Sequence, residues 1–231
     1  MTLTYEIFQA NLARVRAEID ETCALVGRTP SSVRLLPVTK NHPPEIVDYV
    51  VRAGLGAVGE NRVQEARQKR PLAASTLHWE LIGHLQSNKA RLAASLFQRI
   101  QSVDSTYLLD RLEKAAADAD RTLALLLQVN TGADPAKTGC TPEQTPALLE
   151  HALGLPHLRV EGLMTIAPLD NDPDTARRAF ENLRVCRDSL ADRFHIPLAE
   201  LSMGMSADLR QAIAAGSTLL RIGTALFGSR T

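Results

Sequence analysis

The chain has few of the residues and patterns that mark several large classes of protein. It contains three cysteines, Cys23, Cys140 and Cys186, which are odd in number and widely separated. This spacing provides neither a disulfide framework nor a CxxC motif, and it favours a reducing compartment such as the cytoplasm. The 26 Lys and Arg residues balance the 26 Asp and Glu residues. The excess of basic charge that is typical of nucleic-acid-binding domains is therefore absent.

Long hydrophobic runs are also absent. The longest, LALLLQV at residues 123–129, is far shorter than the roughly 20 residues that span a bilayer. The first residues lack the basic start, apolar centre and small-residue cleavage site of a secretory signal. We therefore expect a cytoplasmic protein that binds neither membranes nor nucleic acid.

The sequence does contain a regular alternation of short apolar segments and helical segments. A helix is expected over the first 26 residues, because apolar residues recur there at spacings of three and four. Strands are predicted at residues 34–39, 57–59, 78–82, 99–103, 123–129, 158–163, 200–202 and 218–222. Helices are predicted between them at residues 45–54, 62–70, 88–96, 105–119, 142–153, 173–194 and 208–215.

Strict alternation of strands and helices predicts parallel strands joined by crossover helices. Eight such units predict an α/β fold of the (β/α)8 TIM-barrel type, whose usual size is about 250 residues. We expect one domain covering residues 1–231, with an extra helix before the first strand. A doubly wound open sheet is the alternative, because the predicted strands at residues 57–59 and 200–202 are very short.

Functional residues of such a barrel follow the carboxyl ends of its strands. Lys40 follows the first strand and alternates with Leu36 and Val38, so all three share one face. A lysine facing into the barrel mouth is partly desolvated, which lowers its pKa and makes its amine a nucleophile that can form a Schiff base. A solvated loop lysine would fit the same spacing.

The ends of the second, seventh and eighth strands carry further candidates. Asn61 either binds a ligand or caps the next helix. Segments 202–208 and 223–228 combine glycines with the Ser206 hydroxyl and predicted helix starts, which suits phosphate binding but also simple turns. Arg221 on the eighth strand binds a ligand or forms a structural salt bridge.

Two other signals indicate neither a metal site nor a dinucleotide site, although the polar loop at residues 83–89 either lines a pocket or starts a helix. His84 has no second ligand at metal-binding spacing, so we assign no metal site. The literal GxGxxG at residues 54–59 does not lie between a strand and a helix, as a dinucleotide-binding loop must.

Eight stretches, taken in order, resemble one known family. They are PVTKNHPPE (37–45), GENRVQEA (59–66), HWELIGHLQSNKAR (78–91), QSVDS (101–105), LQVNTGADPAKTG (127–139), EGLMTIAP (161–168), LSMGMSADLRQAIAAGST (201–218) and LLRIGTALFGSR (219–230). The chain is similar over nearly its whole length to the pyridoxal 5'-phosphate homeostasis protein family (YggS/PROSC type), which is related to the alanine racemase N-terminal barrel.

The resemblance implies a barrel like the N-terminal domain of alanine racemase, with pyridoxal 5'-phosphate as cofactor. Lys40 would hold the cofactor as a Schiff base, and Arg221 would face its pyridine nitrogen. The remaining implied contacts are Ser206, Gly223 and Thr224 on the phosphate, with Asn61 and Met203 lining the cofactor.

The resemblance also implies a role. The protein would hold pyridoxal phosphate reversibly for intracellular homeostasis and pass it to apo-enzymes, as a monomer or weak dimer without catalytic residues of its own. The alternative is a pyridoxal-phosphate-dependent amino-acid racemase, which needs acid–base groups on both faces of its substrate. The tyrosines of this chain, Tyr5, Tyr49 and Tyr107, lie in none of the matching motifs. An eight-unit barrel also accounts for almost all 231 residues, so we favour the carrier role.

Overall fold

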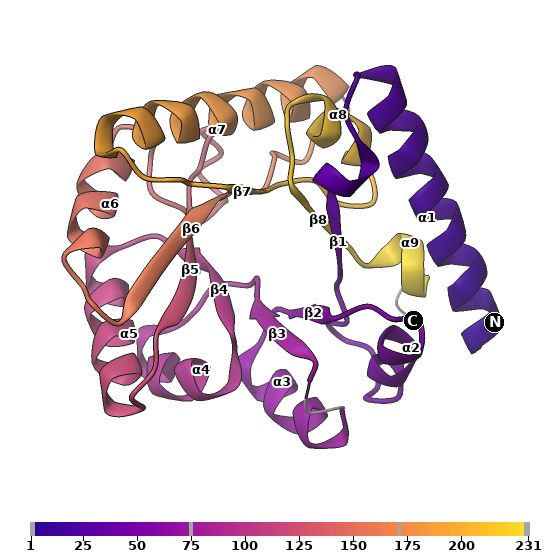
Figure 1. Ribbon diagram of the computed structural model, residues 1–231, viewed down its shortest axis with the longest axis horizontal. Coiled ribbons are helices and arrows are strands. Elements are labelled where there is room, and N and C mark those ends of the chain that lie inside the picture. The colour runs from indigo at the N-terminus through magenta and orange to yellow at the C-terminus, as the bar shows by residue number, and fades with distance from the viewer. Residues whose placement is uncertain (1–2, 74–75, 171, 229–231) are drawn as a thin grey trace.

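The computed structural model describes residues 3–73, 76–170 and 172–228. Eight parallel strands form its centre, and helices surround them (Figure 1). The strands are β1 (Arg34–Pro37), β2 (Ala57–Glu60), β3 (His78–Leu81), β4 (Arg99–Val103), β5 (Leu123–Gln128), β6 (Leu158–Met164), β7 (Glu200–Ser202) and β8 (Leu219–Ile222). The helices are α1 (Tyr5–Leu25), α2 (Ile46–Arg52), α3 (Val63–Lys69), α4 (Ala90–Leu96), α5 (Thr106–Asp118), α6 (Thr145–Leu153), α7 (Pro173–Phe194), α8 (Leu209–Ala214) and α9 (Thr224–Phe227).

The strands pair in the order β1-β8-β7-β6-β5-β4-β3-β2, so each strand except the first and last lies between its sequence neighbours. The ring closes between β1 and β2 through a single parallel bridge, Val38 to Gly59. The Thr39 N–H adds a hydrogen bond of 3.1 Å to the Gly59 carbonyl. The seam between β1 and β2 is therefore the thinnest join of the barrel.

The predicted TIM barrel and its leading helix are confirmed, and the open-sheet alternative is wrong. The predicted first strand was longer than the one observed. Its ladder with β8 extends to Pro37, and the next residue, Val38, forms the bridge to Gly59 on the other side. Helix α9 was predicted only as a phosphate-binding loop, since one helical turn carries too few residues for a periodic pattern.

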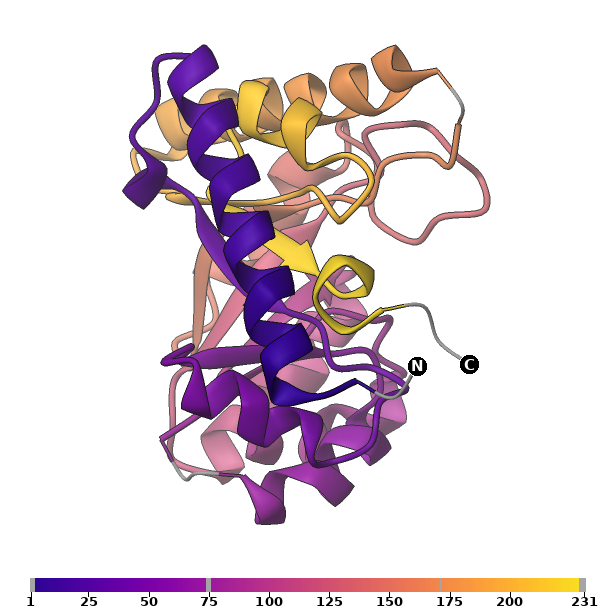
Figure 2. The same cartoon turned by 90° about the vertical axis from the view of Figure 1, so that its right-hand side faces the viewer.

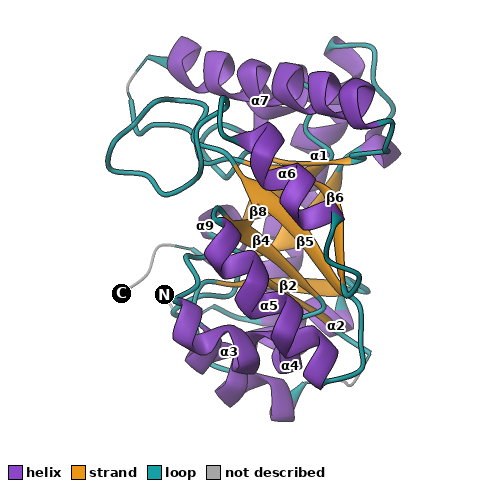
Figure 3. Ribbon diagram, turned by 90° about the vertical axis from the view of Figure 1, so that its left-hand side faces the viewer, coloured by secondary structure: helices purple, strands orange, loops and turns teal. Residues whose placement is uncertain are grey.

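Two layers of apolar side chains hold the barrel together. The larger lies between the strands and the helices and includes Phe8, Trp79 and Phe180. Burial of each such side chain stabilises the fold by about 1.5–3 kcal/mol. The smaller, inside the barrel, consists of Leu36, Val38, Ile82 and Leu219. Figure 3 shows the strands at the centre with the helices outside them.

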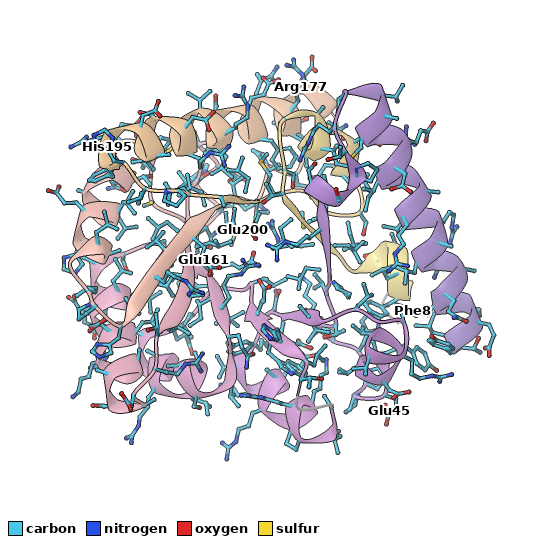
Figure 4. The ribbon with its side chains drawn as sticks, in the orientation of Figure 1. Phe8, Glu45, Glu161, Arg177, His195 and Glu200 are labelled. Atoms are coloured by element: carbon cyan, nitrogen blue, oxygen red, sulfur yellow. The ribbon has the colours of Figure 1, made fainter. Side chains whose placement is uncertain are left out.

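Charged side chains also lie in the barrel interior. At the amino end of the strands, Arg99 pairs with Glu80 at 2.8 Å, with Glu200 at 2.9 Å and with Glu161 at 3.1 Å. Figure 4 shows Glu161 and Glu200 in the central region of the barrel. Three carboxylates thus gather around one guanidinium and form an ion-pair network at this end of the barrel.

Helix α1 lies along the outside of the barrel and contacts α9 (Figure 2). The Phe8 and Phe227 rings stack with centroids 5.4 Å apart. Asn11 Nδ2 donates to the Leu226 carbonyl at 2.9 Å. The leading helix therefore fixes the last helix, which borders the site described below. Among the described residues, no helix combines the length and apolar character needed to cross a membrane.

Candidate functional site

A cavity of about 370 Å³ lies at the carboxyl ends of the strands, where sites of this fold are built. It is lined by Val38, Lys40, Asn61, Ile82, Gly83, His84, Gln128, Thr138, Ile166, Met205, Ser206, Ala207, Arg221, Gly223 and Thr224. Six of the seven residues predicted from the sequence are among them. The seventh, Met203, is fully buried in the core outside the barrel and does not line the cavity.

Lys40 is half-buried at the mouth of the cavity. It continues the inward face of Leu36 and Val38, as strand alternation predicts. The following residue, Asn41, has a backbone φ of 60°, a left-handed conformation in which asparagine is better tolerated than most residues. The chain thus turns sharply away directly after Lys40.

Arg221 is 4% exposed and points into the barrel beside the cavity. Its Nη1 donates to Ser202 Oγ at 2.7 Å, and its Nη2 donates to the Thr165 carbonyl at 2.8 Å. Within the described part of the chain, no carboxylate lies within ion-pair distance of this guanidinium. Burial lowers the pKa of Arg221 to about 10. The group therefore remains a cation at neutral pH, held by neutral acceptors.

Ser206, Gly223 and Thr224 bring two loops together at one side of the cavity. Ser206 Oγ accepts a hydrogen bond of 3.2 Å from the Ala225 N–H in the first turn of α9. Because this hydroxyl acts as an acceptor, its own hydrogen can be donated to a ligand. A Cβ at Gly223 would lie 3.3 Å from the Val38 carbonyl. The donors available here, two hydroxyls and a helix start, suit an oxyanion.

Gln128 and Thr138 line the cavity but were missed by the sequence analysis. Gln128 Nε2 donates to the Thr138 carbonyl at 2.8 Å and to its hydroxyl at 3.0 Å. These hydrogen bonds connect the end of β5 to the loop that follows it, which projects from the barrel in Figure 2. A signal was present, because Gln128 is the single polar residue of an otherwise apolar strand.

Asn61 is half-buried and follows β2 directly. A Cβ on Gly83 would lie 2.4 Å from the Asn61 carbonyl, so this glycine permits the loops after β2 and β3 to touch. Asn61 is thereby brought to the same cavity as the loops after β7 and β8.

The hollow at the other end of the barrel does not offer an equivalent site. A hollow of about 600 Å³ at the opposite end of the barrel is lined by Arg34 and Glu80 among others, whose charges are already paired with protein groups. In the described ranges, no group of three or more His, Cys, Asp or Glu side chains could hold a metal ion.

Comparison with known proteins gives consistent matches. A family model described as the N-terminal domain of alanine racemase matches residues 10–231. The pyridoxal phosphate homeostasis protein of Aquifex aeolicus is 40% identical over 220 residues, covering 95% of this chain and 96% of that protein. The pyridoxal phosphate homeostasis protein of Pseudomonas aeruginosa is 43% identical over 221 residues, covering 95% of this chain and 94% of that protein.

Solved structures show the same similarity. PipY of Synechococcus elongatus, with pyridoxal phosphate bound, is 39% identical with a TM-score of 0.80, over 91% of this chain and 100% of that chain. An alanine racemase of Clostridium difficile has a TM-score of 0.81 at 15% identity, over 97% of this chain and 57% of that chain. The second likeness shows a shared barrel fold alone.

Proposed function

The chain belongs to the family of pyridoxal phosphate homeostasis proteins with the alanine racemase N-terminal barrel, and from this we propose that it binds pyridoxal 5'-phosphate in the cavity at Lys40. The observation that carries the proposal is the convergence of a lysine, a buried arginine and two loops with hydroxyl donors around one cavity. A phosphorylated pyridine aldehyde offers one group to each of these three features.

The donor set fits this ligand. When bound, the cofactor supplies an aldehyde carbon that condenses with a primary amine and releases one water. Lys40 Nζ would provide that amine and form the covalent carbon–nitrogen bond. Ser206, Gly223 and Thr224 would bind the phosphate, Asn61 would orient the ring, and Val38 and Ile82 would contact its faces.

Arg221 would donate a hydrogen bond to the ring nitrogen. With a pKa of about 10, its guanidinium keeps its proton at neutral pH. A ring nitrogen that receives a hydrogen bond but no proton makes the ring a weaker electron sink. Arg221 would therefore hold the cofactor in a state suited to storage more than to transamination.

We propose that the protein is a carrier without catalytic residues, acting in the cytoplasm. A racemase would need a second acid–base group opposite the lysine. The three tyrosines do not line the cavity: Tyr5 and Tyr49 pack edge to face with centroids 5.5 Å apart, and Tyr107 is exposed on α5. We take residues 1–231 as one cofactor-binding domain that delivers pyridoxal phosphate to apo-enzymes, as a monomer or weak dimer.

Two assays test this proposal. Purified protein is titrated with pyridoxal phosphate, and an imine absorption band is expected that Lys40→Ala abolishes. The loaded protein is then mixed with an apo-enzyme that requires the cofactor, and activity should return to the enzyme. Absence of the band in the unsubstituted protein would contradict cofactor binding. Robust racemisation of free amino acids would contradict the carrier role.

A further inference from the structure

A buried cluster on the outer side of the barrel holds the residues on both sides of Lys40. We call Thr39, Glu60, Glu65 and Lys69 the Lys69 cluster. The Lys69 side chain is 3% exposed and that of Glu60 is 0% exposed. Lys69 Nζ donates to the Thr39 carbonyl at 2.7 Å, to Glu60 Oε1 at 2.8 Å and to Glu65 Oε1 at 2.7 Å. All three N–H donors of the ammonium group are thereby used.

The hydrogen bonds of the Lys69 cluster hold the residues directly before and after Lys40 in the chain. On one side, the Thr39 hydroxyl donates to Glu60 Oε1 at 2.6 Å, and the Thr39 carbonyl accepts from Lys69. On the other side, the Asn41 N–H donates to Glu65 Oε1 at 2.5 Å. Because side chains alternate along a strand, Thr39 faces the helices while Lys40 faces the cavity. The cluster can therefore fix the direction of Lys40 through the residues on either side of it.

The same cluster spans the thinnest join of the barrel. Thr39 follows β1 and Glu60 ends β2, while a single bridge connects these two strands. Lys69, at the end of α3, binds atoms from both sides of the seam. Asn61 follows Glu60 directly, so the Lys69 cluster also sets the position at which Asn61 enters the cavity. Two of the predicted cofactor contacts thus depend on one buried ammonium group.

A contribution to the stability of the fold does not explain well why the charged groups of the Lys69 cluster are buried. A buried ion pair is often no more stabilising than well-packed apolar residues of similar volume, because desolvation offsets the attraction. Within the described part of the chain, Glu60 Oε2 is buried without a hydrogen-bond partner, which adds to that cost. Directed hydrogen bonds define the orientation of the peptide groups beside Lys40, whereas apolar packing would not.

We propose that the Lys69 cluster is a positioning device for the cofactor site. Lys69, acting through Thr39, Glu60 and Glu65, holds Lys40 in the geometry in which its amine reaches the aldehyde, while making no contact with the cofactor. This inference rests on the proposed function and assigns to it residues outside the cavity.

The experiment uses the full chain and compares Lys69→Met with a matched control, Arg28→Met. Arg28 likewise donates to main-chain carbonyls, among them those of Ile213 at 2.7 Å and Ser217 at 2.8 Å, but outside the site. Three quantities are measured: hydrogen exchange of the segment 38–42 without cofactor, affinity for pyridoxal phosphate from the imine band, and affinity for pyridoxine 5'-phosphate. The last ligand has an alcohol in place of the aldehyde and reports non-covalent binding alone.

Lys69→Met is expected to speed exchange in the segment 38–42 and to weaken pyridoxal phosphate binding by about tenfold or more, as small misplacements of a reacting group do. Binding of pyridoxine phosphate should weaken by a clearly smaller factor, because the phosphate loops are intact and only the ring contact of Asn61 is disturbed. Arg28→Met should leave all three quantities as in the unsubstituted protein. Unchanged imine formation in a folded Lys69→Met protein would overturn the proposal, as would equal losses for the two ligands.

If Lys69→Met does not fold, two milder variants at Thr39 test the positioning role. Thr39→Val removes the hydroxyl that binds Glu60 and keeps the side-chain shape, whereas Thr39→Ser retains that hydroxyl. We expect slower imine formation in the valine variant and restored formation in the serine variant. Equal rates in both would overturn the positioning role. If the unsubstituted protein forms no imine, the failure lies with the proposed function instead.

Discussion

Arg221 and Ser202 lie on β8 and β7, and Nη1 of the arginine donates to the serine hydroxyl over 2.7 Å. Ser202 Oγ in turn donates to Gln101 Oε1 at 2.6 Å, and Gln101 Nε2 donates to Glu80. The guanidinium beside the cavity is thereby connected through the barrel interior to the ion-pair network at the opposite end. Its orientation is set by the barrel core.

The first prediction concerns Arg221. Replacement by alanine removes the cation that we propose to bind the ring nitrogen, and it leaves buried Ser202 without its donor. We expect a shifted absorption band and affinity for pyridoxal phosphate lower by about tenfold or more, consistent with about 1.5–3 kcal/mol for a hydrogen bond to a charged group. Titration followed by absorbance measures both. An unchanged band and affinity would remove Arg221 from the site.

The second prediction concerns the Ser206 hydroxyl, which bridges the two loops that we propose to bind the phosphate. In Ser206→Ala, affinity for pyridoxal 5'-phosphate should fall by about tenfold, since one charge-assisted hydrogen bond is lost. Affinity for pyridoxal, which lacks the phosphate, should stay the same. Calorimetric titration with the two ligands separates these effects, and a parallel loss for both would show that Ser206 does not serve the phosphate.

The third prediction concerns stability at Gly204. This residue has a φ of 95°, and a Cβ on it would lie 2.4 Å from the Ala212 Cβ. Gly204→Ala should lower the free energy of unfolding by about 1–3 kcal/mol from strain and overpacking. Gly56→Ala is the control, because a Cβ there meets nothing within 4 Å. Denaturant unfolding of the two variants is the measurement, and equal midpoints would contradict the expected strain.

The fourth prediction concerns the pH dependence of stability at Glu60. Burial raises the pKa of this carboxyl above its usual 4.5. The folded protein therefore holds the proton more tightly than the unfolded chain. This contribution to stability is present below about pH 4.5 and is lost as the pH rises through the raised pKa.

Glu60→Gln removes that titration. The difference in unfolding free energy between the unsubstituted protein and Glu60→Gln should fall as the pH rises from about 4.5 and then level off. Denaturant melts at several pH values measure it. A difference that grows with pH would show that the folded state stabilises the charged carboxylate instead.

Much of the fold and of the site could be predicted from the sequence, because barrel topology places strand ends together. The alternation of side chains along the first strand correctly predicted that Lys40 lies on the same face as Leu36 and Val38. Met203 could not be placed in the same way, because β7 has only three residues and does not show which face is inward. Ser202 faces the interior and bonds Arg221, so Met203 faces the outer core.

Other parts of the site left no periodic signal. Lys69 has the sequence context of a solvated helical lysine, and only the tertiary structure shows it buried beneath the β1–β2 seam. Thr138 reaches the cavity through its loop and its hydrogen bonds to Gln128. Such contacts depend on loop paths that local patterns do not specify.

The covalent attachment point tests the account most directly. The protein is loaded with pyridoxal phosphate, reduced with borohydride to fix any carbon–nitrogen bond, digested and analysed by mass spectrometry. The account predicts the reduced phosphopyridoxyl group on Lys40, and none on buried Lys69. Modification confined to other lysines, with Lys40 unmodified, would contradict it.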